Sequence, residues 1–250
     1  MAANAVGIGI LGFGGFAMFA SQQFAQVPGA ALRCIADTHR EASLACAARF
    51  GLADVQRAEV MFAMPDVQLV YIATPPFLHY AQARDALRAG KHVILEKPLA
   101  VTMEHADELV SIARDKGLLL VTNLMQRYNP LFGQIKELVD SKVLGDVLHG
   151  TFENYASDEG LGPDHWFWDA TKSGGIFIEH GVHFFDMFAG WLGAGSVESA
   201  GRVLRPGLGI EEQVYCTARY GGVPVPSITA LRRPAGWTVR SCASSSSVAT

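Results

Sequence analysis

The chain has 250 residues, of which 50% are hydrophobic and 18% are charged, as in an ordinary globular protein. This length suits one large domain or two modest ones. The formal net charge of -4 provides none of the basic surface that binds nucleic acid by neutralising phosphates, so the composition argues against a nucleic-acid partner.

The four cysteines, Cys34, Cys46, Cys216 and Cys242, lie far apart and show no spacing typical of zinc ligands or of a disulfide framework. This usage fits a reducing compartment, so we expect a cytoplasmic protein without a metal. The apolar stretch 6–20 is similar to a signal peptide, but no Lys or Arg precedes it and five glycines interrupt it. We therefore expect neither secretion nor a membrane partner.

Short apolar runs alternate with helical stretches in the first half of the chain. Runs that are apolar at nearly every position are typical of strands buried on both faces of a parallel sheet. Alternation of such strands with helices predicts an α/β domain of the Rossmann type over residues 1–123. The expected strands are Val6–Leu11, Ala31–Ala36, Leu69–Ala73, His92–Leu95 and Leu118–Thr122, and the expected helices include His39–Phe50, Leu78–Ala89 and Met103–Lys116.

The pattern changes after Asn123 and predicts an α+β domain over residues 124–223, with a mostly antiparallel open sheet. Residues 224–250 contain three arginines and six serines but no Asp, Glu or Lys, so we expect an atypical tail and an incomplete sheet. The expected elements of the second domain are helices at Pro130–Ser141 and Ile176–Trp191 and strands at Val147–Tyr155, Val197–Leu204 and Gln213–Tyr220.

A glycine-rich motif of the form G-x-G-x-x-G/A follows the first expected strand and opens the first helix. The first two glycines permit a tight turn and close approach of the backbone to a pyrophosphate, and the small last residue lets the helix pack on the strand. A plain strand-to-helix turn is the alternative reading of such a segment by itself. The expected cofactor-binding residues of the motif are Gly12, Phe13, Gly14, Gly15 and Phe16, with Ala17 as the small last residue.

Asp37 ends the second expected strand, 20 residues beyond Ala17. A carboxylate at this place accepts hydrogen bonds from the adenosine ribose, which predicts NAD as the cofactor. Arg40 leaves NADP as an alternative cofactor, because a guanidinium could pair with a 2'-phosphate. The alternative role of Asp37 is to cap the helix that begins at His39.

Further candidates follow the third expected strand, at the sheet edge where open α/β sheets bind ligands. Thr74 and Pro75 come directly after this strand, and His79 lies in the first turn of the next helix. We expect all three to contact the cofactor, although a surface or capping role explains His79 equally well.

Glu96, Lys97 and Pro98 follow the strand His92–Leu95 at the same edge. A lysine here can polarise a substrate hydroxyl or carbonyl, and the proline restricts the turn that aims it. Glu96 is expected beside the cofactor. A Lys-Pro turn on the surface is the alternative.

The helix expected at Ile176–Trp191 carries Glu179, His183 and Asp186 on one face, while His180 lies on the flank, about 100° from Glu179. A carboxylate and an imidazole four residues apart suit acid–base chemistry. A hydrogen-bonded histidine in a domain interface is the alternative. The set contains too few ligands for a metal site.

With these motifs in place, the chain resembles the family of glucose-fructose oxidoreductase, inositol 2-dehydrogenase and the rhizopine catabolism protein MocA. The Glu-Lys-Pro motif and the Gly-Gly helix that carries His183 are the most specific features. The matching segments are IGILGFG at 8–14, ATPP at 73–76, AGKHV at 89–93, EKPLA at 96–100, RYNP at 127–130, and GG at 174–175 with GVHFFD at 181–186.

The resemblance implies NAD(P)-dependent oxidation of a secondary hydroxyl on a sugar, inositol or related polyol. It implies that Lys97 orients and polarises the reacting oxygen and that His183 removes or returns its proton. Glu179 stands where the family usually has aspartate. Candidate substrate-pocket residues are Arg127, Trp166 and Trp168, although a loop tryptophan can simply cover the core.

Family members commonly continue further and complete a sheet whose outer face forms a dimer interface. We therefore expect a family-type homo-oligomer only where that sheet is complete. Two other functions stay open: a dinucleotide-binding protein without catalysis, and a glycosidase that uses bound NAD transiently.

Overall fold

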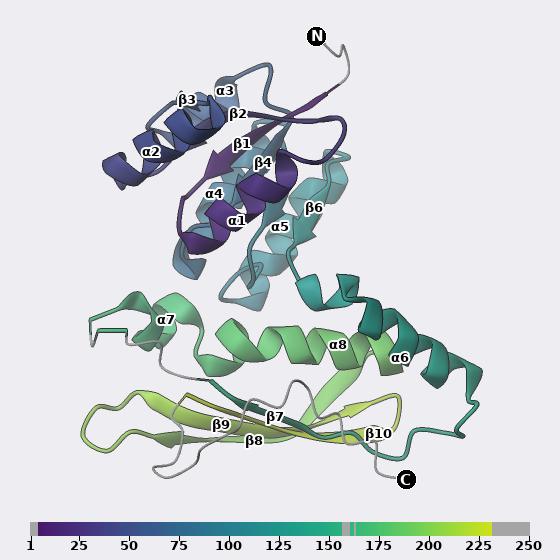
Figure 1. Ribbon diagram of the computed structural model, residues 1–250. Coiled ribbons are helices and arrows are strands. Elements are labelled where there is room, and N and C mark those ends of the chain that lie inside the picture. The colour runs from purple at the N-terminus through teal and green to yellow at the C-terminus, as the bar shows by residue number, and fades with distance from the viewer. Residues whose placement is uncertain (1–4, 157–160, 163, 232–250) are drawn as a thin grey trace.

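Two sheets organise the chain, one in each half, and the computed structural model describes residues 5–156, 161–162 and 164–231 (Figure 1). The first sheet has six parallel strands in the order β3-β2-β1-β4-β5-β6. These strands are β1 (Val6–Leu11), β2 (Ala30–Ala36), β3 (Ala53–Asp54), β4 (Leu69–Ile72), β5 (His92–Leu95) and β6 (Leu120–Thr122).

Helices cover both faces of this sheet, as the predicted Rossmann fold requires. One face packs Ile10 and Tyr71 against Ala17 of α1 and Cys46 of α2. The other face packs against α3, α4 and α5. The strand order reverses between β1 and β4, and this switch point is where such sheets bind ligands. The helices are α1 (Gly15–Phe24), α2 (Arg40–Phe50), α3 (Ala58–Ala63), α4 (Pro76–Arg88) and α5 (Met103–Asp115).

The second sheet has the order β7-β10-β9-β8 and is mostly antiparallel, as predicted. Only the β10–β7 pair is parallel. Its strands are β7 (Phe152–Tyr155), β8 (Gly195–Leu204), β9 (Glu211–Tyr220) and β10 (Val223–Ala230).

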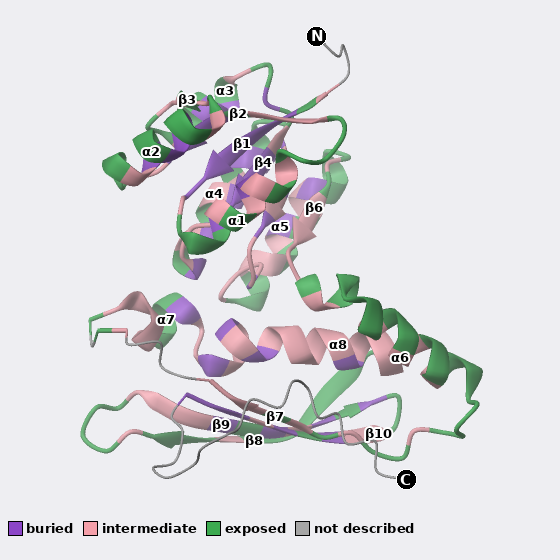
Figure 2. Cartoon of the chain, in the orientation of Figure 1, coloured by how far each residue is buried: buried purple, intermediate pink, exposed green. Residues whose placement is uncertain are grey.

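The helix α8 (Val182–Leu192) lies between this sheet and the first domain (Figure 1). Its Phe188 packs on Ala218, Tyr220 and Val225 of the sheet. Alongside runs α6 (Pro130–Ser141), which has no buried residue and is drawn mostly as exposed in Figure 2. Short helical turns complete the second half: η1 (Met125–Tyr128), η2 (Trp166–Trp168), α7 (Ala170–Ser173) and η3 (Phe177–Gly181).

The strand β10 corrects the expected tail, which was placed too early at residue 224. Pro224 and Pro226 argue against a strand because proline lacks the amide donor of a sheet ladder. Both are accommodated because β7 pairs only with 227–230 of β10, so the prolines lie where one side of β10 has no strand beside it. The rest of the expected tail, 232–250, lies outside the described residues.

No helix in the described part of the chain is both long and apolar enough to cross a membrane.

Candidate active site

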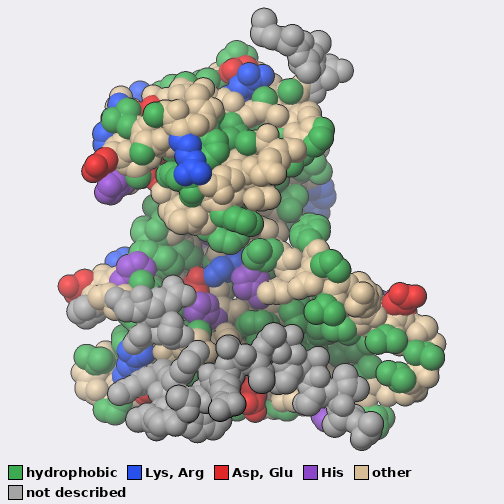
Figure 3. Space-filling model, viewed as in Figure 1, with side chains coloured by type: hydrophobic (Ala, Val, Ile, Leu, Met, Phe, Trp, Pro, Cys, Tyr) green, Lys and Arg blue, Asp and Glu red, His purple; other side chains and the backbone are tan. Residues whose placement is uncertain are grey.

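A cavity of about 1190 Å³ is lined by residues of both domains. In the space-filling view a hollow separates the two halves, and Lys/Arg, Asp/Glu and His side chains gather in it (Figure 3). The first domain contributes the glycine-rich loop and the carboxyl ends of β1, β2, β4 and β5, and the second contributes residues around Trp166 and the helix that carries His183. The volume exceeds that of typical small-molecule pockets, so it has room for a dinucleotide together with a substrate.

The glycine-rich loop fits a pyrophosphate. Gly12 has φ +84, and a Cβ there would lie 2.7 Å from Thr74 Cγ2, so this turn requires glycine. A Cβ on Gly14 would meet no atom within 4 Å, which leaves open space at the start of α1. The first turn of α1 has no side-chain cap and no acidic residue, so its amides are available to an anion. Gly15 begins α1 but does not line the cavity.

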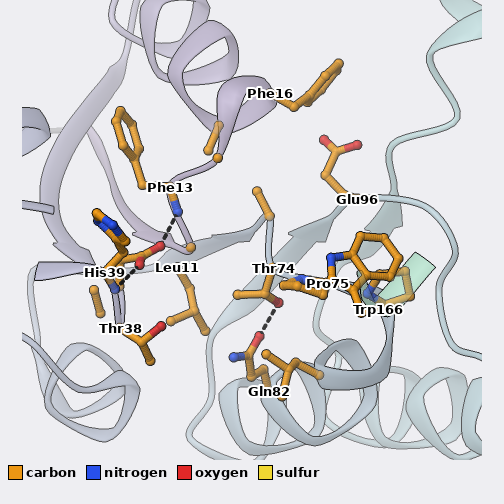
Figure 4. Close-up of a pocket in the computed structure, with 18 of the residues that line it drawn as sticks. Leu11, Phe13, Phe16, Thr38, His39, Thr74, Pro75, Gln82, Glu96 and Trp166 are labelled. Atoms are coloured by element: carbon orange, nitrogen blue, oxygen red, sulfur yellow. Dashed lines mark hydrogen bonds between the residues drawn. The ribbon is translucent and has the colours of Figure 1, made fainter. Parts of the chain in front are cut away.

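Asp37 lies beside this loop and is held by two backbone amides. Phe13 N–H and His39 N–H donate to its two carboxylate oxygens, each at 2.5 Å (Figure 4). The cap of α2 is His39, whose Nδ1 accepts from Ala42 N–H, so the capping alternative for Asp37 is wrong. A carboxylate has about four acceptor positions, so further ones stay open to ribose hydroxyls.

Arg40 does not line the cavity, because its guanidinium forms an ion pair with Asp54. The arginine at this end of the cavity is Arg57, which precedes α3 and which sequence reasoning missed. Only its place after the short strand β3 could have indicated it.

Thr74 and Pro75 line the cavity as expected, with Thr74 Oγ1 donating to Gln82 Oε1 at 2.6 Å (Figure 4). His79 does not line it, which corrects the expected cofactor contact. Its fully buried ring lies behind the wall, with Nδ1 2.7 Å from Pro98 O and Nε2 2.8 Å from Thr74 O. This histidine thus ties the loop after β4 to the Lys97–Pro98 turn.

Glu96 lines the cavity and is oriented from behind by two side chains. Tyr71 Oη and Asn123 Nδ2 both donate to its Oε1, the second at 2.8 Å. Burial raises the pKa of Glu96, and the two hydrogen bonds and Lys97 oppose this shift.

Lys97 reaches across the domain interface to Glu179. Its Nζ donates to the main-chain oxygen of Glu179 at 2.7 Å and forms an ion pair with Oε1 of the same residue. Burial raises the pKa of Glu179, but His180 and Lys97 outweigh it and lower this pKa to about 2. Glu179 is therefore ionised near neutral pH, and the added methylene relative to aspartate still presents its carboxylate to Lys97.

The helix that carries Glu179 differs from the expected continuous α-helix. Residues Phe177–Gly181 form a π-helical turn before α8 begins at Val182. The wider turn changes which side chains share a face. As a result His180, expected on the flank, lines the cavity with Glu179 and His183. Its Nδ1 lies 2.8 Å from Glu179 Oε2, although the ring is not aligned for a linear hydrogen bond.

His183 lines the cavity, and its Nδ1 is buried without a hydrogen-bond partner among the described residues. Burial, and then the charge of Lys97, lower the pKa of His183. The imidazole is therefore neutral near pH 7 and able to accept a proton.

Of the three expected substrate residues, only Trp166 lines the cavity. Arg127 is instead paired with Asp186, its Nε and one terminal nitrogen each lying 2.7 Å from a carboxylate oxygen. Trp168 donates from Nε1 to Gly162 O at 3.0 Å, and Arg205 lies over its ring. Spacing alone does not show which way a loop side chain points, and neither residue lines the cavity.

Two family models match the chain. The oxidoreductase family model with an NAD-binding Rossmann fold, GFO_IDH_MocA, matches residues 6–124. The GFO/IDH/MocA C-terminal domain model matches residues 132–239. The chain belongs to the Gfo/Idh/MocA oxidoreductase family. Its first domain is an NAD-binding Rossmann domain. The match of the C-terminal model extends to residue 239, into the stretch 224–250 that was expected to be an atypical tail.

The curated relatives include two proteins with named activities. A dTDP-3,4-didehydro-2,6-dideoxy-alpha-D-glucose 3-reductase from Actinomadura kijaniata is 33% identical over 160 residues, covering 63% of this chain and 46% of that protein. A scyllo-inositol 2-dehydrogenase (NAD(+)) from Bacillus subtilis is 27% identical over 202 residues, covering 80% of this chain and 56% of that protein. The chain spans about half the length of these curated relatives.

Among solved structures, a 3-ketoreductase from Actinomadura kijaniata in complex with TDP-benzene and NADP superimposes with a TM-score of 0.83. It is 25% identical, and the alignment covers 91% of this chain and 70% of that one. A protein from gentamicin A biosynthesis in complex with NAD has a TM-score of 0.84 at 24% identity and supports the fold alone.

Proposed function

We propose that the protein is an NAD(P)-dependent oxidoreductase that transfers a hydride between a nicotinamide cofactor and the secondary carbinol carbon of a sugar, an inositol or a related polyol. The observation that carries this proposal is the grouping of Lys97, Glu179 and His183 around the cavity that the glycine-rich loop also borders. A cation to polarise an oxygen and a neutral imidazole to take its proton are what alcohol oxidation requires from a protein.

In the oxidative direction, Lys97 Nζ donates a hydrogen bond to the substrate oxygen and stabilises the negative charge that grows there. Neutral His183 accepts the hydroxyl proton. The bound nicotinamide supplies the hydride acceptor, so the carbon loses a hydride with its two electrons and the C–O bond becomes a carbonyl. In the reductive direction, His183 would return the proton to the oxygen while Lys97 stabilises the charge there, and the cofactor would supply the hydride to the carbon.

Glu179 holds Lys97 in place through both its carboxylate and its main-chain oxygen. Because the carboxylate stays ionised, its ion pair with Lys97 limits the rotation of the lysine side chain. Trp166 from the second domain is the proposed substrate-side aromatic residue, since it borders the same cavity.

NAD is the proposed cofactor, with NADP as the second choice. The proposal rests on Asp37 at the adenosine end of the cavity and on the pairing of Arg40 with Asp54 instead of with the cavity. Arg57 is the side chain that would favour a 2'-phosphate.

The polyol class is supported by the relatives that act on an inositol and on a dideoxy sugar nucleotide. The test is nicotinamide absorbance with NAD or NADP and a panel of inositols, sugars and sugar nucleotides. We expect reduction of the cofactor with at least one polyol. A folded preparation that binds NAD and turns over none of the panel, in either direction, contradicts the proposal, as does release of free sugar from a glycoside without net NADH.

A further inference from the structure

A second imidazole, His180, lines the cavity beside the three proposed catalytic residues, and the proposed reaction has no task for it. The π-helical turn Phe177–Gly181 brings it there. Its side chain stays 24% exposed, and its ring is held from one side by Phe167, with ring centroids 5.5 Å apart. Its Nε2 has no hydrogen-bond partner within the described part of the chain.

The surroundings of His180 leave one of its ring nitrogens for a ligand. Lys97 occupies Oε1 and the main-chain oxygen of Glu179, so Oε2 is the oxygen of this residue that faces His180. Nδ1 lies 2.8 Å from this oxygen, so Nε2 is the ring nitrogen left to form a hydrogen bond with a bound substrate.

The reacting hydroxyl is already engaged by other residues. In the proposed reaction its one proton goes to His183, and Lys97 donates to its oxygen. A second hydroxyl on the substrate would give Nε2 a hydrogen-bond partner.

We propose that His180 is a specificity residue whose Nε2 forms a hydrogen bond with the hydroxyl on the carbon next to the oxidised one. The preferred substrates are then vicinal diols, or α-hydroxy ketones in the reductive direction. This inference rests on the proposed function, because it uses Lys97 and His183 to place the reacting oxygen. A substrate without this hydroxyl would leave Nε2 without a partner. The protein would therefore bind the transition state for oxidation of that substrate less tightly.

The test compares a vicinal cyclohexanediol with cyclohexanol, which differ only in the neighbouring hydroxyl, using the full chain with NAD. For the unchanged protein we expect kcat/KM to favour the diol by roughly tenfold or more. His180→Phe keeps a ring against Phe167 but removes both ring nitrogens. It should abolish the preference for the diol, so that this variant has about the same kcat/KM for the diol and for cyclohexanol.

His149→Asn is the matched control, since His149 is exposed and lies outside the cavity. It should keep the full preference for the diol. Thermal melting and NAD binding establish that each variant is folded, and His180→Asn replaces His180→Phe if the latter does not fold. Equal losses on both alcohols, or an unchanged preference in the variant, would overturn the inference.

Failure of the proposed function looks different, because then neither alcohol nor any panel member is oxidised. In that case NMR saturation transfer from the protein–NADH complex to each alcohol decides on His180. Tighter binding of the diol that disappears in His180→Phe supports the inference, and equal binding in both proteins contradicts it.

Discussion

Lys97 and Glu179 lie 82 residues apart in the sequence, and their ion pair joins the end of a parallel strand in the first domain to a π-helical turn in the second. Both side chains are largely buried, at 19% and 11% exposure. The pair therefore forms only when the two domains pack together, and the same contact aligns the lysine with the glycine-rich loop. The site is therefore complete only when the two domains are packed together.

Replacing Lys97 with methionine should reduce hydride transfer while leaving the cofactor bound. The variant keeps the length of the side chain but removes the donor that stabilises the developing charge, so we expect kcat to fall roughly a hundredfold to a thousandfold. Stopped-flow nicotinamide absorbance measures the rate, and calorimetry with NAD measures binding. Lys116→Met, at an exposed position on the far end of α5, is the control that should keep full activity. Equal turnover in both variants would remove Lys97 from the mechanism.

The buried ion pair between Lys97 and Glu179 should also contribute to the free energy of unfolding. Glu179→Gln leaves the ammonium of Lys97 without its counter-charge, and we expect a loss of about 3 kcal/mol. Adding Lys97→Met to this variant should restore part of the loss, because no unpaired charge then remains. Urea unfolding of the two single variants and the double variant completes the cycle. Strictly additive losses would show that the two side chains do not interact in solution.

Oxidation should stay active below the pH at which an ordinary histidine becomes protonated. The base form of His183 is the neutral ring, and its pKa lies below the usual 6.5 because of burial and the charge of Lys97. The rate is therefore maintained as pH falls through 6.5 and decreases only near the lower pKa of His183. Removing the lysine charge in Lys97→Met should raise this pKa, which an NMR titration of the His183 ring protons measures. A pKa that is unchanged or lower in the variant would contradict this electrostatic account.

The sequence predicted the first domain well because its signals are local. Continuous apolar runs such as Val6–Leu11 reflect burial on both faces, and the glycine motif with Asp37 reflects backbone geometry that few residues allow. His180 could not be placed, because a π-helical turn leaves no trace in the hydrophobic period from which helix faces are read. Arg127 and Trp168 were misplaced because their direction depends on Asp186 and Gly162, contacts that spacing does not reveal.

Cofactor choice should depend on Asp37 and not on Arg40. Asp37→Ala removes the proposed ribose acceptor and leaves the Phe13 amide without its partner, so affinity for NAD should fall roughly tenfold to a hundredfold. Arg40→Ala should leave the NADP affinity unchanged, because the guanidinium is paired with Asp54, whereas Arg57→Ala should weaken NADP. Calorimetry with both dinucleotides measures these constants. A selective loss of NADP binding in Arg40→Ala would show that this arginine leaves Asp54 when the phosphate binds.

His79 should prove to be a positioning residue for two loops of the site. Its ring nitrogens lie against the carbonyls of Thr74 and Pro98, so His79→Ala leaves a buried cavity and removes the ring N–H that donates to one of these carbonyls. We expect a loss of about 3 kcal/mol in the free energy of unfolding, together with weaker NAD binding. His79→Gln, which retains an amide donor, should recover part of both, and His149→Ala at an exposed position should change neither. Normal stability with impaired NAD binding in His79→Ala would instead indicate direct contact with the cofactor. Urea unfolding and calorimetry on the same preparations separate the two outcomes.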